Sequence, residues 1–259
     1  MPTSNDSLGI VETKQVTLFD AGNPLTLVCG DQLNEVVIAY ETYGTLNADA
    51  SNAIYICHAL TGDAHAAGWH EGDKHPGWWD TMIGPGKAID TNKYFVLSSD
   101  TLVNLNTGDP KTTTTGPAST NPDTGKPYGL DFPVVTVRDF VEVQKALVES
   151  LGIKKLALVA GPSMGSLQTF EWAASHPEMV AKAMPVIGAG EADAMLIAWL
   201  DVWAAPILVD PNWNNGDYYG KTPPLAGLAK ALTAVTLQAN HQDWANATFG
   251  RRPAKEGEE

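Results

Sequence analysis

The chain has 259 residues, of which 44% are hydrophobic and 18% are charged, and its formal net charge is −14. This length and composition are typical of a soluble globular protein with a substantial core, and they exclude wholesale disorder. The negative charge argues against a general role in binding nucleic acid or an anionic membrane. The first ten residues, MPTSNDSLGI, contain no basic segment followed by an apolar one, so we expect no signal peptide and a cytoplasmic location.

The first fifty residues predict antiparallel strands, because apolar and polar positions alternate in KQVTLFD, PLTLVCG and NEVVIAYETYG. Three later stretches, AIYICHALTG, KYFVLSSD and KLALVAG, are nearly continuous apolar runs, typical of strands buried on both faces. The stretch VVTVRDFVEVQKALVESLGI has helical spacing and ends at Gly152, and AKAMPVIGAG predicts a further strand. This alternation predicts an α/β fold with a mostly parallel sheet and helices on both faces.

The pattern changes after Gly190. Residues 191–250 contain two or three amphipathic helical segments and the polar loop DPNWNNGDYYGKTPP, without another convincing strand. We therefore predict an α/β core over residues 1–190 and a helical cap over residues 191–259. The apolar stretch ADAMLIAWLDVWAAPILV is interrupted by Asp193 and Asp201 and is too short to cross a bilayer, so no membrane span is expected.

A Gly-x-Ser-x-Gly motif surrounds Ser163, with Gly161 and Gly165 on either side. The motif alone is common, but here an apolar strand precedes it and a helical pattern follows, as at the strand–turn–helix bend of a serine nucleophile. The glycines allow neighbouring backbones to approach closely, and the helix N-terminus favours negative charge nearby. The alternative is a simple glycine-rich turn, which this context disfavours.

A serine that attacks a carbonyl also needs backbone N–H groups that bind the developing oxyanion. The N–H of Met164, directly after the serine, is one such donor. A second donor fits the loop in CHALTGDAH, because this loop follows a buried strand and so lies at the carboxyl end of the sheet. Taken alone, that stretch fits an ordinary strand–loop connection equally well.

One region of the sequence is rich in residue types that ligate metals: His58, Asp63, His65, His70, Glu71, Asp73, His75 and Asp80. The stretch HEGDKH within it has one residue more than the helical H-E-x-x-H zinc motif, and Gly72 disfavours the helix that would align the two imidazoles. We therefore expect no metal site. Two cysteines, Cys29 and Cys57, are too few for a disulfide framework and are expected to be buried thiols.

Four long stretches, in order, resemble homoserine O-acetyltransferases, a family with the α/β-hydrolase fold: AYETYGTLNADASNAIYICHALTGDAHAAG, PGWWDTMIGPGKAIDTNKYFV, TTGPASTNPDTGKPYGLDFPVVTVRD and DPNWNNGDYYG. The resemblance covers roughly residues 10–251. It implies that Ser163 is the nucleophile and that the backbone N–H groups of Leu60 and Met164 bind the oxyanion. It implies no cofactor, with acetyl-CoA as an alternative co-substrate, and it implies a homodimer.

In this family the aspartate and histidine that activate the serine follow the helical cap. We therefore expect both residues outside these 259 residues, together with the last strands of the sheet, on the same polypeptide or on a separate chain. His241 with Asp210 or Asp217 is an alternative pair, but it matches no family position. A sheet without its last strands would expose an apolar edge.

Several positions depart from the family pattern. The family's turn reads Gly-Gly-Ser-Met-Gly-Gly, and Pro162 and Ser166 replace two of those glycines here. In the cap, Leu232 and Ala239 stand where the resemblance places an arginine and a tyrosine that hold the amino-acid substrate. Leucine cannot bind a carboxylate as arginine does, and the nearby Lys230 compensates only weakly. These departures favour an apolar acyl or alcohol group as substrate.

Residues and resemblance together predict a serine-dependent acyl-transfer enzyme. We expect it to hydrolyse simple carboxylic (acetyl) esters, or to acylate an acceptor other than homoserine, through an acyl-Ser163 intermediate. The alternatives are a homoserine O-acetyltransferase that uses acetyl-CoA and a non-catalytic family member with a binding role. The retained Ser163, Gly161 and Gly165 argue against the non-catalytic alternative.

Overall fold

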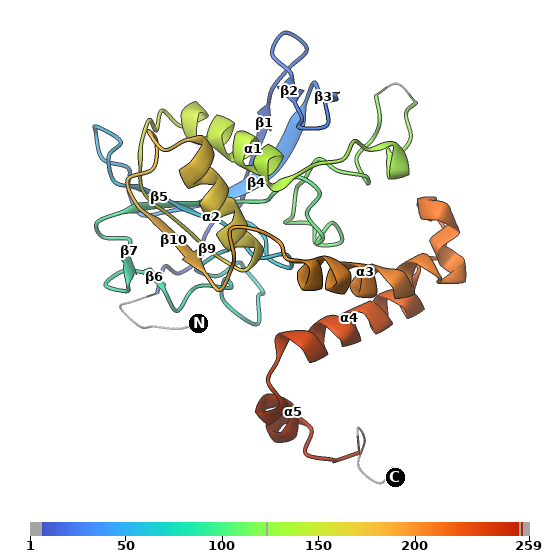
Figure 1. Ribbon diagram of the computed structural model, residues 1–259. Coiled ribbons are helices and arrows are strands. Elements are labelled where there is room, and N and C mark those ends of the chain that lie inside the picture. The colour runs from blue at the N-terminus through green and yellow to red at the C-terminus, as the bar shows by residue number, and fades with distance from the viewer. Residues whose placement is uncertain (1–6, 123, 254, 256–259) are drawn as a thin grey trace. The chain divides into compact units, whose positions relative to one another are not determined.

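The computed structural model describes residues 7–122, 124–253 and 255 (Figure 1). The chain divides into two compact units, Met1–Gly190 and Glu191–Glu259. Within the described ranges, the strands belong to the first unit, whereas the second unit is built from helices and their connections.

A six-stranded sheet forms the centre of the first unit, with the strand order β1-β4-β8-β5-β9-β10. Its strands are β1 Lys14–Leu18, β4 Val36–Tyr43, β5 Ala53–Ile56, β8 Phe95–Ser99, β9 Leu156–Pro162 and β10 Ala183–Val186. β4 pairs antiparallel with both β1 and β8, whereas β8, β5, β9 and β10 run parallel to one another. The predicted combination of antiparallel N-terminal strands with a parallel centre is confirmed.

Two smaller pairs of strands flank this sheet. Antiparallel β2 and β3 span Leu25–Thr26 and Gln32–Leu33, and parallel β6 and β7 span Ile83–Gly84 and Ile89–Asp90.

The two cysteines differ in their surroundings. Cys29 lies in the turn between β2 and β3 and is exposed, so the prediction of a buried thiol is wrong there; a tight turn leaves its side chain in solvent. Cys57 follows β5 and is buried as predicted, and burial raises the pKa of its thiol.

The two faces of the sheet are covered differently. Helices α1 (Val137–Ser150) and α2 (Met164–Ser175) pack together on one face, against strand residues such as Tyr55 (Figure 1). The opposite face, which includes Ile56, packs against the segment 66–89 that contains β6 and β7. In the described part of this unit, the prediction of helices on both faces therefore holds for one face only. The reason is that the segment between β5 and β8 is rich in glycine, proline and tryptophan and forms turns.

Helix α1 confirms the helix predicted before Gly152. The helix follows the short 3₁₀ helix η1 (Gly129–Asp131) and begins after Thr136, whose N–H donates to Asp139 Oδ2 at 2.6 Å. It ends before Gly152, which has a φ of 75°. Glycine adopts this left-handed conformation without the steric penalty of a side chain, and this ends the helix.

The second unit contains α3 (Ala194–Leu208), η2 (Pro211–Gly216), α4 (Leu225–Ala239) and α5 (Gln242–Thr248). Helices α3 and α4 pack against each other, and the carboxylate of Asp210 accepts the Gly227 N–H of α4 at 2.7 Å. No helix in the described part of the chain is both long enough and apolar enough to span a membrane.

Many large apolar side chains of this helical unit are exposed. Those on α3 and α4 are Met195, Ile197, Leu200, Val202, Leu208, Leu225, Leu228, Leu232 and Leu237. An apolar surface of this kind is typical of an interface.

Candidate active site

Ser163 occupies a sharp bend between β9 and α2. Its φ and ψ are 54° and −121°, a conformation that residues other than glycine adopt rarely. The backbone holds this strain, because Ser163 N–H donates to Val186 O at 3.0 Å and Ser163 O accepts the Ser166 N–H at 2.8 Å. Ser166 Oγ donates to the same carbonyl at 2.5 Å. The bend leaves residue 163 exposed, at the N-terminus of a helix.

The two glycines of the motif lie where the end of β5 passes the bend. A Cβ atom on Gly161 would lie 2.5 Å from Cys57 O, and one on Gly165 would collide with the same carbonyl. Any side chain at either position would therefore push the strand away. Glycine at these two positions keeps the loop after β5 beside the first turn of α2.

Buried amide side chains fasten that loop to the helices. Gln168 on α2 donates from Nε2 to His58 O at 3.1 Å, and its Oε1 accepts from Gln144 Nε2 on α1 at 2.5 Å. Gln144 Oε1 in turn accepts from Trp172 Nε1 at 2.8 Å. All four residues are fully buried, so each of these bonds is made where water cannot replace it.

The two proposed oxyanion donors belong to these adjoining elements. Met164 is the first residue of α2, and Leu60 lies in the turn that follows β5, where the Gly62 N–H donates to Ala59 O at 2.9 Å. The structure thus brings together the two backbone segments that contain Leu60 and Met164. Both segments lie at the carboxyl end of the parallel strands.

His58 lies near the bend but is unsuited to act as a base. Its Nε2 accepts the Thr101 N–H at 3.2 Å, so Nδ1 carries the proton and donates to Ala59 O at 2.7 Å. Complete burial lowers the pKa of His58 to about 4. The imidazole is neutral and ties the loop after β5 to the loop after β8.

Among the described residues, Ser163 Oγ has no hydrogen-bond partner. His176, at the end of α2, contacts Glu142 through Nε2 at 2.9 Å. His241 caps α5, where its Nδ1 accepts the Asp243 N–H at 3.3 Å.

The alternative triad of His241 with Asp210 or Asp217 is not formed. Asp210 accepts backbone N–H groups of Asn212 and Gly227, and Asp217 pairs with Lys221 at 2.8 Å. Both carboxylates therefore serve local structure in the helical unit.

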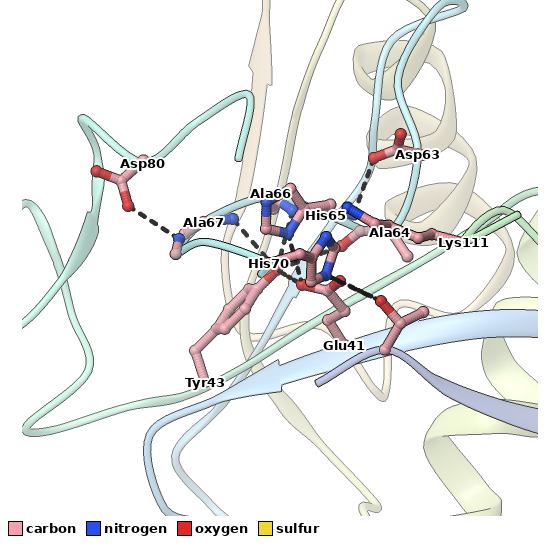
Figure 2. A network of polar contacts seen from close by, with 12 residues as sticks. Glu41, Tyr43, Asp63, Ala64, His65, Ala66, Ala67, His70, Asp80 and Lys111 are labelled. Atoms are coloured by element: carbon pink, nitrogen blue, oxygen red, sulfur yellow. Dashed lines mark hydrogen bonds and ion pairs between the residues drawn. The ribbon is translucent and has the colours of Figure 1, made fainter. Parts of the chain in front are cut away.

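A second polar cluster surrounds Glu41 on β4 (Figure 2). His65 Nδ1 lies 3.0 Å from Glu41 Oε2 and His70 Nε2 lies 2.7 Å from Glu41 Oε1. Burial alone would raise the pKa of Glu41, but hydrogen bonds from His65, Tyr43 and Thr13 outweigh it and hold that pKa below its ordinary value.

The spacing of HEGDKH predicts no metal site, but spacing reports only on neighbours in sequence. The structure instead groups His65 and His70 with Glu41, which lies more than twenty residues away along the chain, while His75 is exposed and outside this group. A strand residue with the alternating pattern of β4 gives no sequence signal of such a role.

The sequence matches the family model of the α/β hydrolase fold over residues 52–256. The chain belongs to the α/β-hydrolase family. The resemblance to homoserine O-acetyltransferases is also confirmed. This α/β-hydrolase is 51% identical over 246 residues to the homoserine O-acetyltransferase of Methanohalobium evestigatum, covering 95% of this chain and 48% of that protein. It is 49% identical over 253 residues to that of Deferribacter desulfuricans, covering 97% of this chain and 65% of that protein.

Solved structures of similar proteins include both enzyme types. Esterase E22 superposes with a TM-score of 0.90 at 51% identity, covering 96% of this α/β-hydrolase chain and 67% of that chain. The homoserine O-acetyltransferase from Bacillus anthracis superposes with a TM-score of 0.86 at 38% identity, covering 96% of this chain and 65% of that chain. The chain spans about half the length of several of the curated relatives that it matches.

Proposed function

We propose that this chain carries the nucleophile of a serine-dependent acyl-transfer enzyme that hydrolyses simple carboxylic (acetyl) esters or acylates an acceptor other than homoserine. The observation that carries the proposal is the geometry of Ser163. A strained bend presents it at a helix N-terminus, and two glycines bring the loop with Leu60 alongside. In α/β-hydrolases such a bend exposes the attacking oxygen above the sheet.

The reaction follows from this geometry. Ser163 Oγ attacks the ester carbonyl, and the backbone N–H groups of Leu60 and Met164 bind the oxyanion of the tetrahedral intermediate. Collapse of this intermediate breaks the bond to the leaving alcohol and forms acyl-Ser163. Water or an acceptor alcohol then attacks the acyl group and restores the serine.

A base must take the serine proton and return it to the leaving alcohol. We propose that this histidine, with the carboxylate that orients it, lies in polypeptide outside these 259 residues, as the resemblance implies. Support comes from five described histidines that are each engaged with another group: His58, His65, His70, His176 and His241. The same polypeptide would pair with β10, whose described strand partner is β9 alone.

Two observations bear on the acyl acceptor. Leu232 and Ala239, on α4, replace the arginine and tyrosine expected to hold an amino-acid substrate, and this favours an ester or a simple alcohol. Against that, relatives that are about half identical to this chain are homoserine O-acetyltransferases. A homoserine O-acetyltransferase that uses acetyl-CoA is therefore the second candidate.

We also propose a homodimer, supported by the exposed apolar side chains of α3 and α4. Light scattering of the full-length protein measures its mass in solution. A dimer mass agrees with the proposal, and a monomer at micromolar concentration contradicts it.

The experiment that separates the two candidates supplies both substrates to the full-length protein. We expect rapid release of p-nitrophenol from p-nitrophenyl acetate, and little CoA release from acetyl-CoA with homoserine. Fast CoA release that depends on homoserine would overturn the esterase proposal and support the second candidate. Neither activity, in a correctly folded protein, would support a non-catalytic role.

A further inference from the structure

Four hydrogen-bond donors surround the carboxylate of Glu41, which is completely buried. Thr13 Oγ1 and His70 Nε2 lie 2.8 and 2.7 Å from Oε1. Tyr43 Oη and His65 Nδ1 lie 2.7 and 3.0 Å from Oε2. A carboxylate offers about four lone-pair positions, so these donors satisfy Glu41 completely.

This arrangement fixes the proton on each imidazole. Both histidines direct an N–H at Glu41, so in the neutral ring the other nitrogen carries a lone pair: Nε2 of His65 and Nδ1 of His70. The rings lie side by side, with centroids 3.9 Å apart and an angle of 27° between their planes. Both lone-pair nitrogens therefore lie on the side away from Glu41.

Those two nitrogens meet a third electron-pair donor. Asp73 Oδ2 lies 3.7 Å from His65 Nε2 and 3.3 Å from His70 Nδ1. Lys111 occupies the other carboxylate oxygen, Oδ1, at 2.6 Å. His65 Nε2 is buried without a hydrogen-bond partner. Asp73 Oδ2 also accepts the His70 backbone N–H at 3.0 Å, and its second lone pair stays available for a cation shared with the two imidazole nitrogens.

A proton is a poor cation for this position. Placed on His70 Nδ1 it would reach Asp73 but would leave His65 Nε2 buried and unpaired. Placed on His65 Nε2 it would face an oxygen 3.7 Å away, which is beyond hydrogen-bond range. A metal ion bonds to all three atoms at once.

We propose that His65 Nε2, His70 Nδ1 and Asp73 Oδ2 bind one divalent transition-metal ion of the zinc class, with Glu41 as the carboxylate that orients both histidines from behind. A tetrahedral zinc site with bonds of about 2.0–2.1 Å separates its ligand atoms by about 3.3–3.4 Å, close to the spacing of Asp73 Oδ2 from each nitrogen. Imidazole ligands select zinc and its neighbours over Mg²⁺ and Ca²⁺.

The surroundings supply access and a fourth ligand. These residues line a cavity of about 260 Å³ that Asp63, Asp109 and Lys74 also border, which leaves room for a bound water. Carboxylates that hold metal-ligating histidines from behind are common in zinc proteins. The site would join β4 to the segment that follows the Leu60 loop.

Zinc binding to the full-length protein tests this proposal without reference to its activity. The protein is stripped with a chelator, dialysed and titrated with Zn²⁺ by calorimetry, and its metal content is then measured. We expect one equivalent bound with micromolar or tighter affinity, together with a higher Tm in the presence of Zn²⁺. Failure to bind one equivalent would overturn the proposal.

Variants identify the ligands. His65→Gln and Asp73→Asn should each weaken Zn²⁺ binding by about 100-fold or more, and Glu41→Gln by about 10- to 100-fold. Asp73 is only half-buried, so its variant is expected to fold even if the others do not. The matched control is His75→Gln, because His75 borders the same cavity but is exposed and is not one of the three proposed ligands. Equal binding by wild type and Asp73→Asn, or equal loss in His75→Gln, would contradict the assignment.

Discussion

The bend at Ser163 and the cluster around Glu41 are built in different ways. The bend comes from one continuous stretch, in which a strand, a turn and a helix follow one another between Leu156 and Ser175. The cluster draws Thr13, Glu41, His65 and Asp73 from separate parts of the chain. Local sequence therefore specifies the first, while only the assembled fold specifies the second.

The largest effect is expected at the serine itself. Ser163→Ala removes the attacking oxygen while leaving the bend intact, so kcat/KM for p-nitrophenyl acetate should fall by roughly 10⁴- to 10⁶-fold. The control is Ser51→Ala, since Ser51 lies in an exposed loop. Comparable turnover by the Ser163 variant would show that the bend is structural and does not supply the nucleophile.

The next effect concerns the close approach of the backbone. Gly165→Ala places a Cβ against Cys57 O, and relieving that overlap should cost about 3 kcal/mol of unfolding free energy. Gly108→Ala is the matched control, because nothing lies within 4 Å of a Cβ there. Denaturant titration measures both variants. Equal stability of the two would mean that the loop after β5 is not held by this contact.

Gln168 is expected to position the loop after β5. Gln168→Leu removes the hydrogen bond to His58 O and leaves Gln144 Nε2 buried and unpaired, so stability should fall by about 2 kcal/mol. If this bond also holds the Leu60 N–H in place, kcat should fall by about tenfold while KM changes little. An unchanged kcat for the folded fraction would limit Gln168 to a structural role.

The pH dependence of stability provides a smaller test. Burial lowers the folded-state pKa of His58 to about 4, so its neutral form stabilises the fold above about pH 6.5, and this stability is lost as the pH falls towards 4. Between pH 7 and pH 5 the loss from this group is about 2 kcal/mol.

A buried acid opposes this trend. Burial raises the pKa of Asp100 to about 7, so its contribution is present at low pH and is lost as the pH rises towards 7. The net slope of the wild type mixes both groups. His58→Gln, whose amide oxygen still accepts the Thr101 N–H, isolates the histidine. The difference between wild type and variant should change by about 2 kcal/mol between pH 7 and pH 5. A constant difference would contradict a neutral His58.

Sequence patterns predicted the parts of the fold that depend on local periodicity. The apolar runs gave β5, β8 and β9, the helical spacing gave α1, and the glycine motif placed the bend between β9 and α2. These features succeed because each is decided within one segment, by burial on both faces or by the conformational freedom of glycine.

Features that depend on what packs against a segment were missed. Alternation in β4 marked Glu41 as one position of a strand, but not that two histidines from the segment between β5 and β8 lie against its carboxylate. The same segment covers a sheet face that was expected to carry a helix. Cys29 was expected to be buried because its neighbours are apolar, yet the tight turn exposes it.

Chemical modification tests most directly whether Ser163 is the nucleophile. The full-length protein is incubated with a fluorophosphonate, digested, and mapped by mass spectrometry, with heat-denatured protein as the control. A single phosphonyl adduct on Ser163 of the native protein, absent after denaturation, is the expected result. An unmodified Ser163 in native protein, or an adduct confined to another residue, would contradict it.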